Sequence, residues 1–414
     1  MQKMDIGMVG MAVMGSNMAL NMADHGFEVA CYNYTSDLTK QVMKEHPHKC
    51  MHGFYDLQEF VESLKKPRKI MFLIMAGKPV DEMISQLLPL LEQGDILLDG
   101  GNSFFEDTRR RHDFLEERGI RYFGVGISGG EKGARNGPCI MPGGNPEAYE
   151  EVRPIYEAVA AKAGGDPCCT YIGPDGAGHY VKMVHNGIEY ADMQMIADTY
   201  FVMKNVLGMT AEEMADTWEM WNKGELSSYL VEITARILRK ADEMTGKPLV
   251  DVILDVAKQK GTGRWTSMSA LALGVPAPTI TEAVFARTMS SQKEERLVLS
   301  KRYRDLAFEG TEVDRPAVLE DLRQALYASK ICAYAQGFNL LEEAGKVYGW
   351  DLQMGRIAKI WRSGCIIRAR FLDTVSEIFE KENGGLKLLF QNRRKATVDR
   401  KSTRLNSSHR CLSR

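Results

Sequence analysis

The first 32 residues predict a βαβ unit with a glycine-rich turn, and this feature constrains the fold more than any other in the chain. A strand candidate at Met4–Gly10 runs directly into the turn Gly10–Gly15, and a helical pattern and a second strand candidate, Glu28–Tyr32, follow. Glycines in such a turn let phosphate groups approach the backbone N–H groups at a helix N-terminus. Ala12 stands at the second glycine position of the usual motif, so a tight turn in another kind of α/β unit remains an alternative.

Further strand candidates at Lys69–Met75, Asp95–Asp99 and Arg121–Gly126 alternate with helical stretches. This alternation predicts an α/β Rossmann-type, doubly wound domain with a mainly parallel sheet. Two polar, glycine-rich loops are expected where strands of this sheet end, at residues 99–103 and at 126–133, the second continuing to residues 142–144. Ligands gather beyond the carboxyl ends of such strands, so we expect both loops to contribute to a site.

After residues 171–178 the strand signals nearly vanish, and the remaining pattern predicts a large all-α domain. Trp221-x-x-Gly224 recurs as Trp361-x-x-Gly364, an offset of 140 residues, which favours a duplicated helical unit over a chance match. The sequence therefore predicts a dinucleotide-binding domain at 1–176, a helical substrate and dimerisation domain at 177–390, and a tail at 391–414.

Composition excludes several classes of function. The net charge of −2 gives no general attraction to nucleic acid or to an anionic membrane, and the apolar runs are too short to span a bilayer. With no secretory leader pattern at the start, we expect a cytoplasmic protein. His46, His48, Cys50 and His52 could ligate zinc if their tract were a strand, but we favour a surface connection and expect no metal.

Residues 180–190 carry the strongest functional pattern of the helical half. In a helix, Lys182, His185, Asn186, Glu189 and Tyr190 fall within an arc of roughly 140°, apart from an apolar stripe. The lysine and the glutamate are two turns apart, roughly 10 Å along the axis, enough to flank a sugar-sized molecule. A solvated surface helix is the alternative explanation, although the glycine at position 187 costs such a helix about 1 kcal/mol.

Two cationic features lie further along the chain. Residues 260–265 form a basic, glycine-rich segment that could hold an anion, and Arg287 could clamp a phosphate through two hydrogen bonds. A solvated loop and a surface arginine remain equally good explanations. At the end of the second strand candidate, Asn33–Thr35 contains neither the acidic residue typical of NAD sites nor the arginine typical of NADP sites.

The chain resembles the 6-phosphogluconate dehydrogenase family, the decarboxylating enzymes of the pentose phosphate pathway, from about residue 3 to about residue 390. The resemblance rests on the segments GMAVMG, DGGNS, SGGEKGA, PDGAGHYVKMVHNGIEY, KGTGRWTS and SGCIIRA. The long segment around Lys182 distinguishes this family from other β-hydroxyacid dehydrogenases. The resemblance implies oxidative decarboxylation of 6-phosphogluconate to ribulose 5-phosphate and CO2, with reduction of NADP or NAD, in a homodimer.

By the same resemblance, Lys182 is the general base and Glu189 the general acid. The implied substrate residues are Asn102, Ser128, Gly129, Gly130, His185, Asn186, Tyr190, Lys260 and Arg287. The implied cofactor residues are Gly10, Met11, Ala12, Val13, Met14, Gly15, Asn33, Tyr34, Thr35, Ile74, Met75, Ala76 and Asn102. Neutral Lys182 takes the proton of the C3 hydroxyl, which requires a pKa below its ordinary value of about 10.4. Glu189 then protonates C1 of the enediol.

The chain departs from the family pattern in three places. Tyr34 and Met75 replace the arginine and the lysine usual in NADP-using members, so we expect relaxed cofactor selectivity that favours NAD. The basic, aperiodic segment 391–414 looks foreign to the fold, and we expect it to replace the family's C-terminal tail, leaving the phosphate site incomplete and weakening the dimer. Alternatives to the family's activity are a non-decarboxylating β-hydroxyacid dehydrogenase and a catalytically impaired binding protein.

Overall fold

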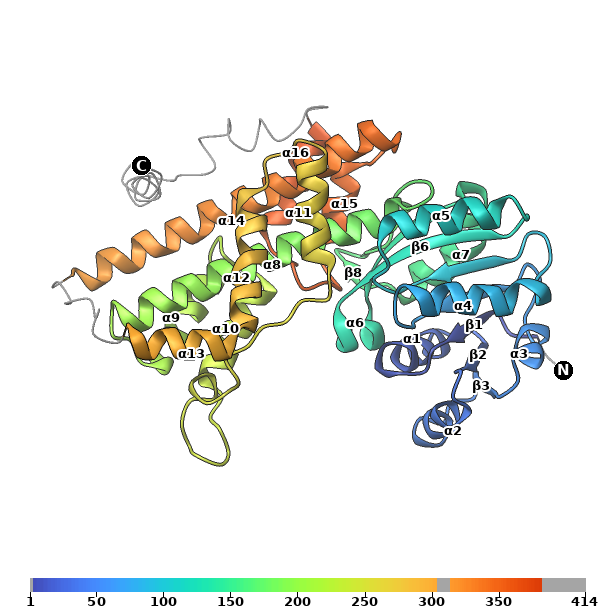
Figure 1. The fold of residues 1–414 in the computed structure, drawn as a ribbon, viewed down its shortest axis with the longest axis horizontal. Helices are drawn as coiled ribbons and strands as arrows, with labels where there is room; N and C mark the ends of the chain where they lie inside the picture. Colours follow the sequence, from blue (N-terminus) through green and yellow to red (C-terminus); the bar gives the residue numbers. More distant parts are fainter. Residues whose placement is uncertain (1–2, 304–312, 382–414) are drawn as a thin grey trace. The chain divides into compact units, whose positions relative to one another are not determined.

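The computed structural model describes residues 3–303 and 313–381 (Figure 1). These residues divide into two compact units. Of the described residues, the first unit comprises 3–184 and 341–368, and the second comprises 185–303, 313–340 and 369–381. Residues 341–368 fall within the predicted helical domain, whereas in the structure this segment packs with the sheet-bearing unit.

The first unit is built on a twisted seven-stranded sheet in the order β3-β2-β1-β4-β5-β6-β7. The strands are β1 (Ile6–Val9), β2 (Val29–Tyr32), β3 (Met51–Phe54), β4 (Lys69–Phe72), β5 (Ile96–Asp99), β6 (Arg121–Ser128) and β7 (Cys139–Gly144). All neighbours pair in parallel except β6 and β7, which are antiparallel. The strand order reverses between β1 and β4, where doubly wound sheets bind ligands. The predicted Rossmann-type fold class is confirmed.

Helices cover both faces of this sheet, so its central strands are buried throughout, as in other parallel sheets. One hydrophobic core includes Ile6 and Met8 of β1 with Met18 of α1 (Val13–Asp24) and Tyr156 of α7 (Pro146–Val159). The other includes Val9 with residues of the opposite helices. These opposite helices are α3 (Leu57–Glu62), α4 (Lys78–Leu87) and α5 (Phe105–Glu116).

The remaining elements of this unit are short apart from one long helix. They are α2 (Ser36–Glu45), the 3-10 helix η1 (Leu88–Leu90), α6 (Gly130–Asn136), the hairpin β8 (Lys162–Ala163) and β9 (Asp166–Pro167), and α15 (Met354–Ile360). The long helix α8 (Ala177–Asn205) begins in this unit and continues into the second unit.

The second unit is helical. Its described elements are α9 (Ala211–Asn222), α10 (Tyr229–Arg239), η2 (Leu249–Asp251), α11 (Thr262–Ala272), α12 (Pro278–Ser291), α13 (Lys293–Arg302), α14 (Arg315–Tyr348) and α16 (Phe371–Lys381). The end of α14, from residue 341, belongs to the first unit. Helices α8, α9 and α10 are a long helix followed by two shorter ones, and α14, α15 and α16 repeat this order. Ser228 and Ala369, which lie shortly before α10 and α16, form a β-bridge with each other. Both observations support the predicted duplication.

In the part of the chain that the structure describes, no helix is long and apolar enough to cross a membrane. Within the same part, no group of three or more His, Cys, Asp or Glu side chains could hold a metal ion. His52 instead contacts Glu28 (Nε2 to Oε2, 2.6 Å), and His48 faces Asp24 at 3.5 Å. His52 lies in β3, so the end of this tract is a strand rather than the predicted surface connection.

Candidate functional site

The turn between β1 and α1 has the backbone geometry of a phosphate-binding turn. Gly10 has a φ of +97°, and a Cβ there would lie 2.5 Å from the carbonyl oxygen of Leu73. A Cβ on Gly15 would lie 1.7 Å from the carbonyl oxygen of Gly10, so only glycine fits at both positions. Ala12 is the N-cap of α1 and offers no side-chain hydrogen bond, which leaves first-turn N–H groups for an anion.

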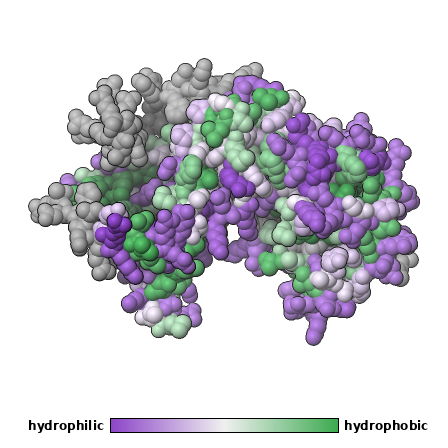
Figure 2. All heavy atoms as spheres, in the orientation of Figure 1, coloured by the Kyte–Doolittle hydropathy of each residue, from purple (hydrophilic) through white to green (hydrophobic). Residues whose placement is uncertain are grey.

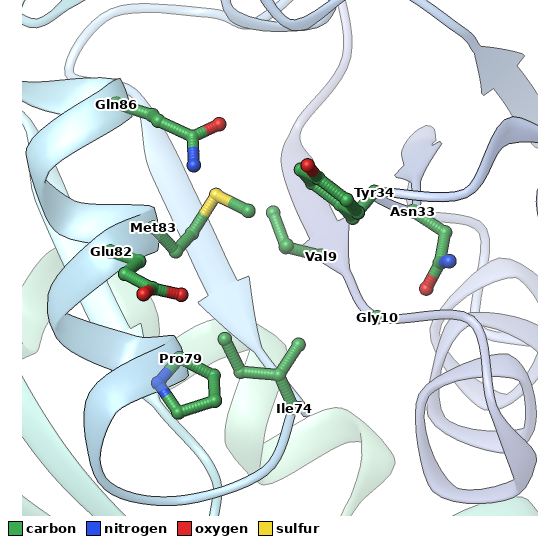
Figure 3. Close-up of a pocket in the computed structure, with 9 residues that line it drawn as sticks. All are labelled: Val9, Gly10, Asn33, Tyr34, Ile74, Pro79, Glu82, Met83 and Gln86. Carbon is green, nitrogen blue, oxygen red and sulfur yellow. The ribbon is translucent and has the colours of Figure 1, made fainter.

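A cavity of about 480 Å³ opens beside this turn (Figure 3). It is lined by Val9, Gly10, Asn33, Tyr34, Ile74, Pro79, Glu82, Met83 and Gln86. The structure thus brings together four of the predicted cofactor residues: Gly10, Asn33, Tyr34 and Ile74. Asn33 ties the strand end to the glycine turn, because its Oδ1 accepts a hydrogen bond from the N–H of Met11 at 3.0 Å. Met75 does not line the cavity, and its side chain is 74% exposed.

The four lining residues on α4 were missed by the sequence analysis. Pro79, Glu82, Met83 and Gln86 lie about one helical turn apart and present one face of α4 to the cavity, opposite Tyr34 (Figure 3). The helical periodicity of residues 78–87 could have identified this face. The sequence does not reveal that α4 packs beside the ends of β1 and β2.

The loop after β5 is fixed by the buried carboxylate of Asp99. Its Oδ2 accepts hydrogen bonds from Ser103 Oγ at 2.6 Å and from the hydroxyl of Tyr122 at 3.1 Å, and its Oδ1 accepts one from the N–H of Gly101 at 3.0 Å. Asn102, between these anchored residues, is exposed. A rigid loop therefore presents an exposed amide, as a cofactor or substrate contact requires.

His179, at the start of α8, is buried beneath the same region. Its Nδ1 lies 2.7 Å from Thr108 Oγ1 on α5, and burial lowers the pKa of its imidazole. An unfolded histidine has a pKa of about 6.5, so below that pH the unfolded chain binds a proton that the folded chain does not. The folded state therefore loses stability as the pH falls below about 6.5.

We expect His179→Gln to reduce this acid sensitivity. One histidine can contribute at most about 1.4 kcal/mol per pH unit. The measurement is the melting temperature of wild type and variant between pH 7.5 and 5.5, with exposed His46→Gln as the control for the substitution itself. Equal pH dependence of the wild type and of His179→Gln would contradict the prediction.

Lys182 lies on α8 where this helix packs closely against β6. A Cβ on Gly126 would lie 2.5 Å from the Cβ of Lys182 and 3.0 Å from the carbonyl oxygen of Gly178, so glycine permits this close packing. Lys182 is 6% exposed, and Ser128, at the end of β6, is 3% exposed. Gly129 follows as the N-cap of α6, and Gly130 is the first residue of that helix.

Two thiols of the same unit lie in the electrostatic field of Lys182. Burial raises the pKa of Cys365 to about 12 and that of Cys139 well above its ordinary value, and electrostatic interaction with Lys182 opposes both shifts. The N–H of Cys139 donates to the carbonyl oxygen of Gly364 at 2.9 Å. The segment around Cys365 is therefore part of the surroundings of Lys182.

The next turns of α8 carry the predicted substrate residues of the helical unit. His185 is fully buried, and its Nδ1 lies 3.1 Å from Oδ1 of Asn186. Nδ2 of Asn186 donates to Oγ1 of Thr262 on α11 at 3.1 Å. Glu189 is half-buried.

Gly187 is explained by packing. A Cβ at this position would lie 2.6 Å from Cγ2 of Thr266, so glycine lets α11 approach α8 closely. This close packing accounts for a glycine inside a long helix.

The predicted cations of this unit differ in how they are placed. The guanidinium of Arg287 stacks over the ring of Tyr190, with Cζ 4.0 Å from the ring centroid. Lys260 is exposed in the segment that precedes α11. That helix begins at Thr262, so the basic segment 260–265 is a helix start rather than the loop that the sequence predicted.

Residues 142–144 also differ from expectation. The prediction of a glycine-rich site loop is wrong for these residues, because they belong to β7, whose Pro142 pairs with Val125 of β6. A Cβ on Gly143 would lie 2.3 Å from the N–H nitrogen of Gly178, so this glycine serves the packing of α8 on the sheet.

Comparison with known proteins identifies the family. Residues 5–173 match the model of the NAD binding domain of 6-phosphogluconate dehydrogenase, and residues 178–409 match that of its C-terminal domain. The second match includes residues 391–409, within the segment that the sequence analysis considers foreign. That segment lies outside the described residues.

Individual relatives agree with these matches. The chain is 55% identical to the NAD(+)-dependent decarboxylating 6-phosphogluconate dehydrogenase of Bacillus subtilis, over 91% of this chain and 81% of that protein. It is equally identical to the NADP(+)-dependent enzyme of the same organism, over 92% and 81%. The structure of Plasmodium falciparum 6-phosphogluconate dehydrogenase superimposes with a TM-score of 0.90 at 42% identity, covering 98% of this chain and 88% of that one.

A more distant neighbour is 3-hydroxyisobutyrate dehydrogenase of Mycobacterium tuberculosis, with a TM-score of 0.52 and 20% identity over 78% of this chain and 99% of that one. It shares the fold alone. The family matches and the high identities together confirm the predicted family: the chain belongs to the 6-phosphogluconate dehydrogenases.

Proposed function

We propose that the chain catalyses the oxidative decarboxylation of 6-phosphogluconate to ribulose 5-phosphate and CO2. The observation that carries this proposal is helix α8, which bears a buried lysine at position 182 and a series of polar side chains over the next two turns. This arrangement offers an amine, an imidazole, an amide and a carboxyl group to a polyhydroxy acid. Family membership supports the same activity.

The cofactor in this proposal is a nicotinamide dinucleotide, which would supply the hydride acceptor. The residues of the first unit fit such a group. The turn Gly10–Gly15 offers backbone N–H groups to the pyrophosphate, and the cavity beside Asn33 and Tyr34 has the position of an adenosine site. Asn102 would contact the cofactor and the substrate from its anchored loop.

The structure supports relaxed selectivity between NADP and NAD. Tyr34 and Met75 are exposed, uncharged side chains at positions where a cation would favour a 2′-phosphate. The relatives do not decide the question, because the chain is equally similar to an NAD(+)-dependent and an NADP(+)-dependent enzyme.

In the proposed mechanism, Lys182 accepts the proton of the C3 hydroxyl as hydride leaves C3. The resulting 3-keto acid is a β-keto acid that loses CO2, and protonated Lys182 stabilises the charge that develops on the carbonyl oxygen. Glu189 then protonates C1 of the enediol. Ser128, Gly129, Gly130, His185, Asn186 and Tyr190 would orient the substrate.

The phosphate of the substrate would contact Arg287 and Lys260. Stacking on Tyr190 fixes the plane of the guanidinium of Arg287, which reduces the entropy lost when it binds an anion. Lys260 adds charge from an exposed position and would act mainly through long-range attraction.

We also propose a cytoplasmic homodimer. Large apolar side chains are exposed on α11, α12 and α13, and Figure 2 shows hydrophobic atoms on the surface that these helices form. They include Met268, Leu271, Phe285, Met289, Leu297 and Val298. Exposed apolar surface of this kind is typical of subunit interfaces, and sedimentation velocity at several protein concentrations would test it.

An assay that measures reduced nicotinamide and CO2 together tests the proposed function. We expect the purified chain to form reduced nicotinamide and CO2 in equal amounts from 6-phosphogluconate, with kcat/KM for NAD and NADP within about a hundredfold of each other. Reduced nicotinamide without CO2 would indicate a non-decarboxylating dehydrogenase. Ligand binding without either product would indicate a binding protein, and a preference for NADP above a hundredfold would refute relaxed selectivity.

A further inference from the structure

The cavity beside β1 and β2 has an unusual distribution of charge for a site that receives a phosphorylated ribose. Among the described residues that line it, Glu82 is the one that carries a charge, and that charge is negative. Its carboxylate lies beside Pro79 at the edge of the cavity (Figure 3). Tyr34 is 78% exposed and contributes no cation. A 2′-phosphate placed here would meet repulsion from the wall of its own site.

A cation lies at the same edge. Lys78, the first residue of α4, forms an ion pair with Glu82 one turn further along the helix, with Nζ 3.1 Å from Oε1. The side chain of Lys78 is 85% exposed and that of Glu82 is 55% exposed. Exposed pairs of this kind contribute only about 0.2–1 kcal/mol, so either partner can be exchanged at little cost.

The start of α4 favours an anionic partner for Lys78. A lysine in the first helical turn opposes the helix dipole, so Lys78 gains from a negative partner. The neighbouring Asp81 is not available as a competitor, because it binds Arg111 at 2.8 Å and Arg110 at 3.0 Å.

We propose that the Lys78–Glu82 pair sets the cofactor selectivity of this chain. Lys78 is the cation that binds a 2′-phosphate, and Glu82 is its counterion when the ribose carries no phosphate. An NADP molecule would take the place of Glu82 as the partner of Lys78, whereas NAD leaves the pair intact. This inference rests on the proposed nicotinamide dinucleotide cofactor, and it explains how one site could accept both forms.

The experiment measures binding of two nucleotides that differ only in the 2′-phosphate, adenosine 2′,5′-bisphosphate and 5′-AMP, by isothermal titration calorimetry on the full chain. We expect Lys78→Met to weaken binding of the bisphosphate by about fivefold and to leave the affinity for 5′-AMP unchanged. Glu82→Gln removes the competing charge and should tighten binding of the bisphosphate about threefold more than binding of 5′-AMP. The control is Lys346→Met on α14, which breaks a similar exposed pair with Glu343 at 3.0 Å.

Salt supplies a second readout. The preference of the wild type for the bisphosphate should fall as ionic strength rises from 0.05 to about 0.5 M, and that of Lys78→Met should change less. Equal effects of Lys78→Met on both nucleotides, or no effect on either, would overturn the assignment. Turnover of the wild type with NAD and NADP tests the proposed function separately, so an active enzyme with unaltered selectivity in Lys78→Met and Glu82→Gln refutes this inference alone.

Discussion

Replacing Lys182 with methionine is expected to lower kcat by about 10³-fold while changing the affinities for substrate and cofactor by less than about fivefold. General base catalysis by a positioned side chain contributes about 10²–10⁴-fold, and the proposed mechanism uses this amine twice. Removing it eliminates both the acceptor for the C3 hydroxyl proton and the cation that stabilises the developing oxyanion. The effect should therefore fall on kcat.

Methionine is the appropriate replacement because it keeps the shape of this buried position. The Cβ of Lys182 is held against β6 at Gly126, and an unbranched thioether can follow the same path as the lysine stem. Burial raises the pKa of Cys139 and Cys365, so both neighbouring thiols stay protonated in the variant. The variant should consequently fold, and its melting temperature can verify this.

The matched control is Lys204→Met, which removes a lysine from the last turn of the same helix, where it pairs with Asp251. Its kcat should stay within about twofold of the wild type, since exposed ion pairs contribute little. Steady-state kinetics and calorimetric titration of 6-phosphogluconate separate kcat from affinity. A Lys182→Met enzyme with near-wild-type kcat would exclude this residue as the base.

Sequence patterns predicted those elements of the fold that depend on residues close together in the chain. The strand candidates at Lys69–Met75 and Asp95–Asp99 correspond to β4 and β5, because continuous apolar runs are typical of strands buried on both faces. The strand β7 was not predicted. Its sequence contains Pro142 and two glycines, which propensity assigns to a loop, and only its pairing with β6 makes it a strand.

Contacts between distant segments could not be predicted in this way. Trp361 lies in the second copy of the sequence repeat, yet its indole Nε1 is 3.4 Å from Sδ of Met141 in the first unit. The face of α4 that lines the cavity is a similar case. Residue types on one helix reveal which side chains share a face, but not which strand ends that face meets.

Replacing Glu189 with glutamine is expected to lower kcat by about 10²-fold and to change the step that limits turnover. In the proposed mechanism Glu189 acts after hydride transfer and loss of CO2, when it protonates C1 of the enediol. Glutamine keeps the size and much of the hydrogen bonding of this half-buried side chain but cannot donate a proton as an acid. Oxidation and decarboxylation should proceed in the first turnover and protonation should become slow.

Two measurements distinguish slow protonation of the enediol from a general loss of activity. Stopped-flow absorbance of reduced nicotinamide should show a burst of about one equivalent per site in Glu189→Gln, and none in the wild type. In D2O each product molecule gains one solvent deuteron at C1. NMR should find it in one of the two prochiral positions for the wild type and divided between both positions for the variant, because water then supplies the proton without control of the face. Asp198→Asn, an exposed acidic residue on the same helix, is the control and should retain kcat and stereochemistry. A Glu189→Gln enzyme that shows no burst and still labels one C1 position would assign the protonation step to another group.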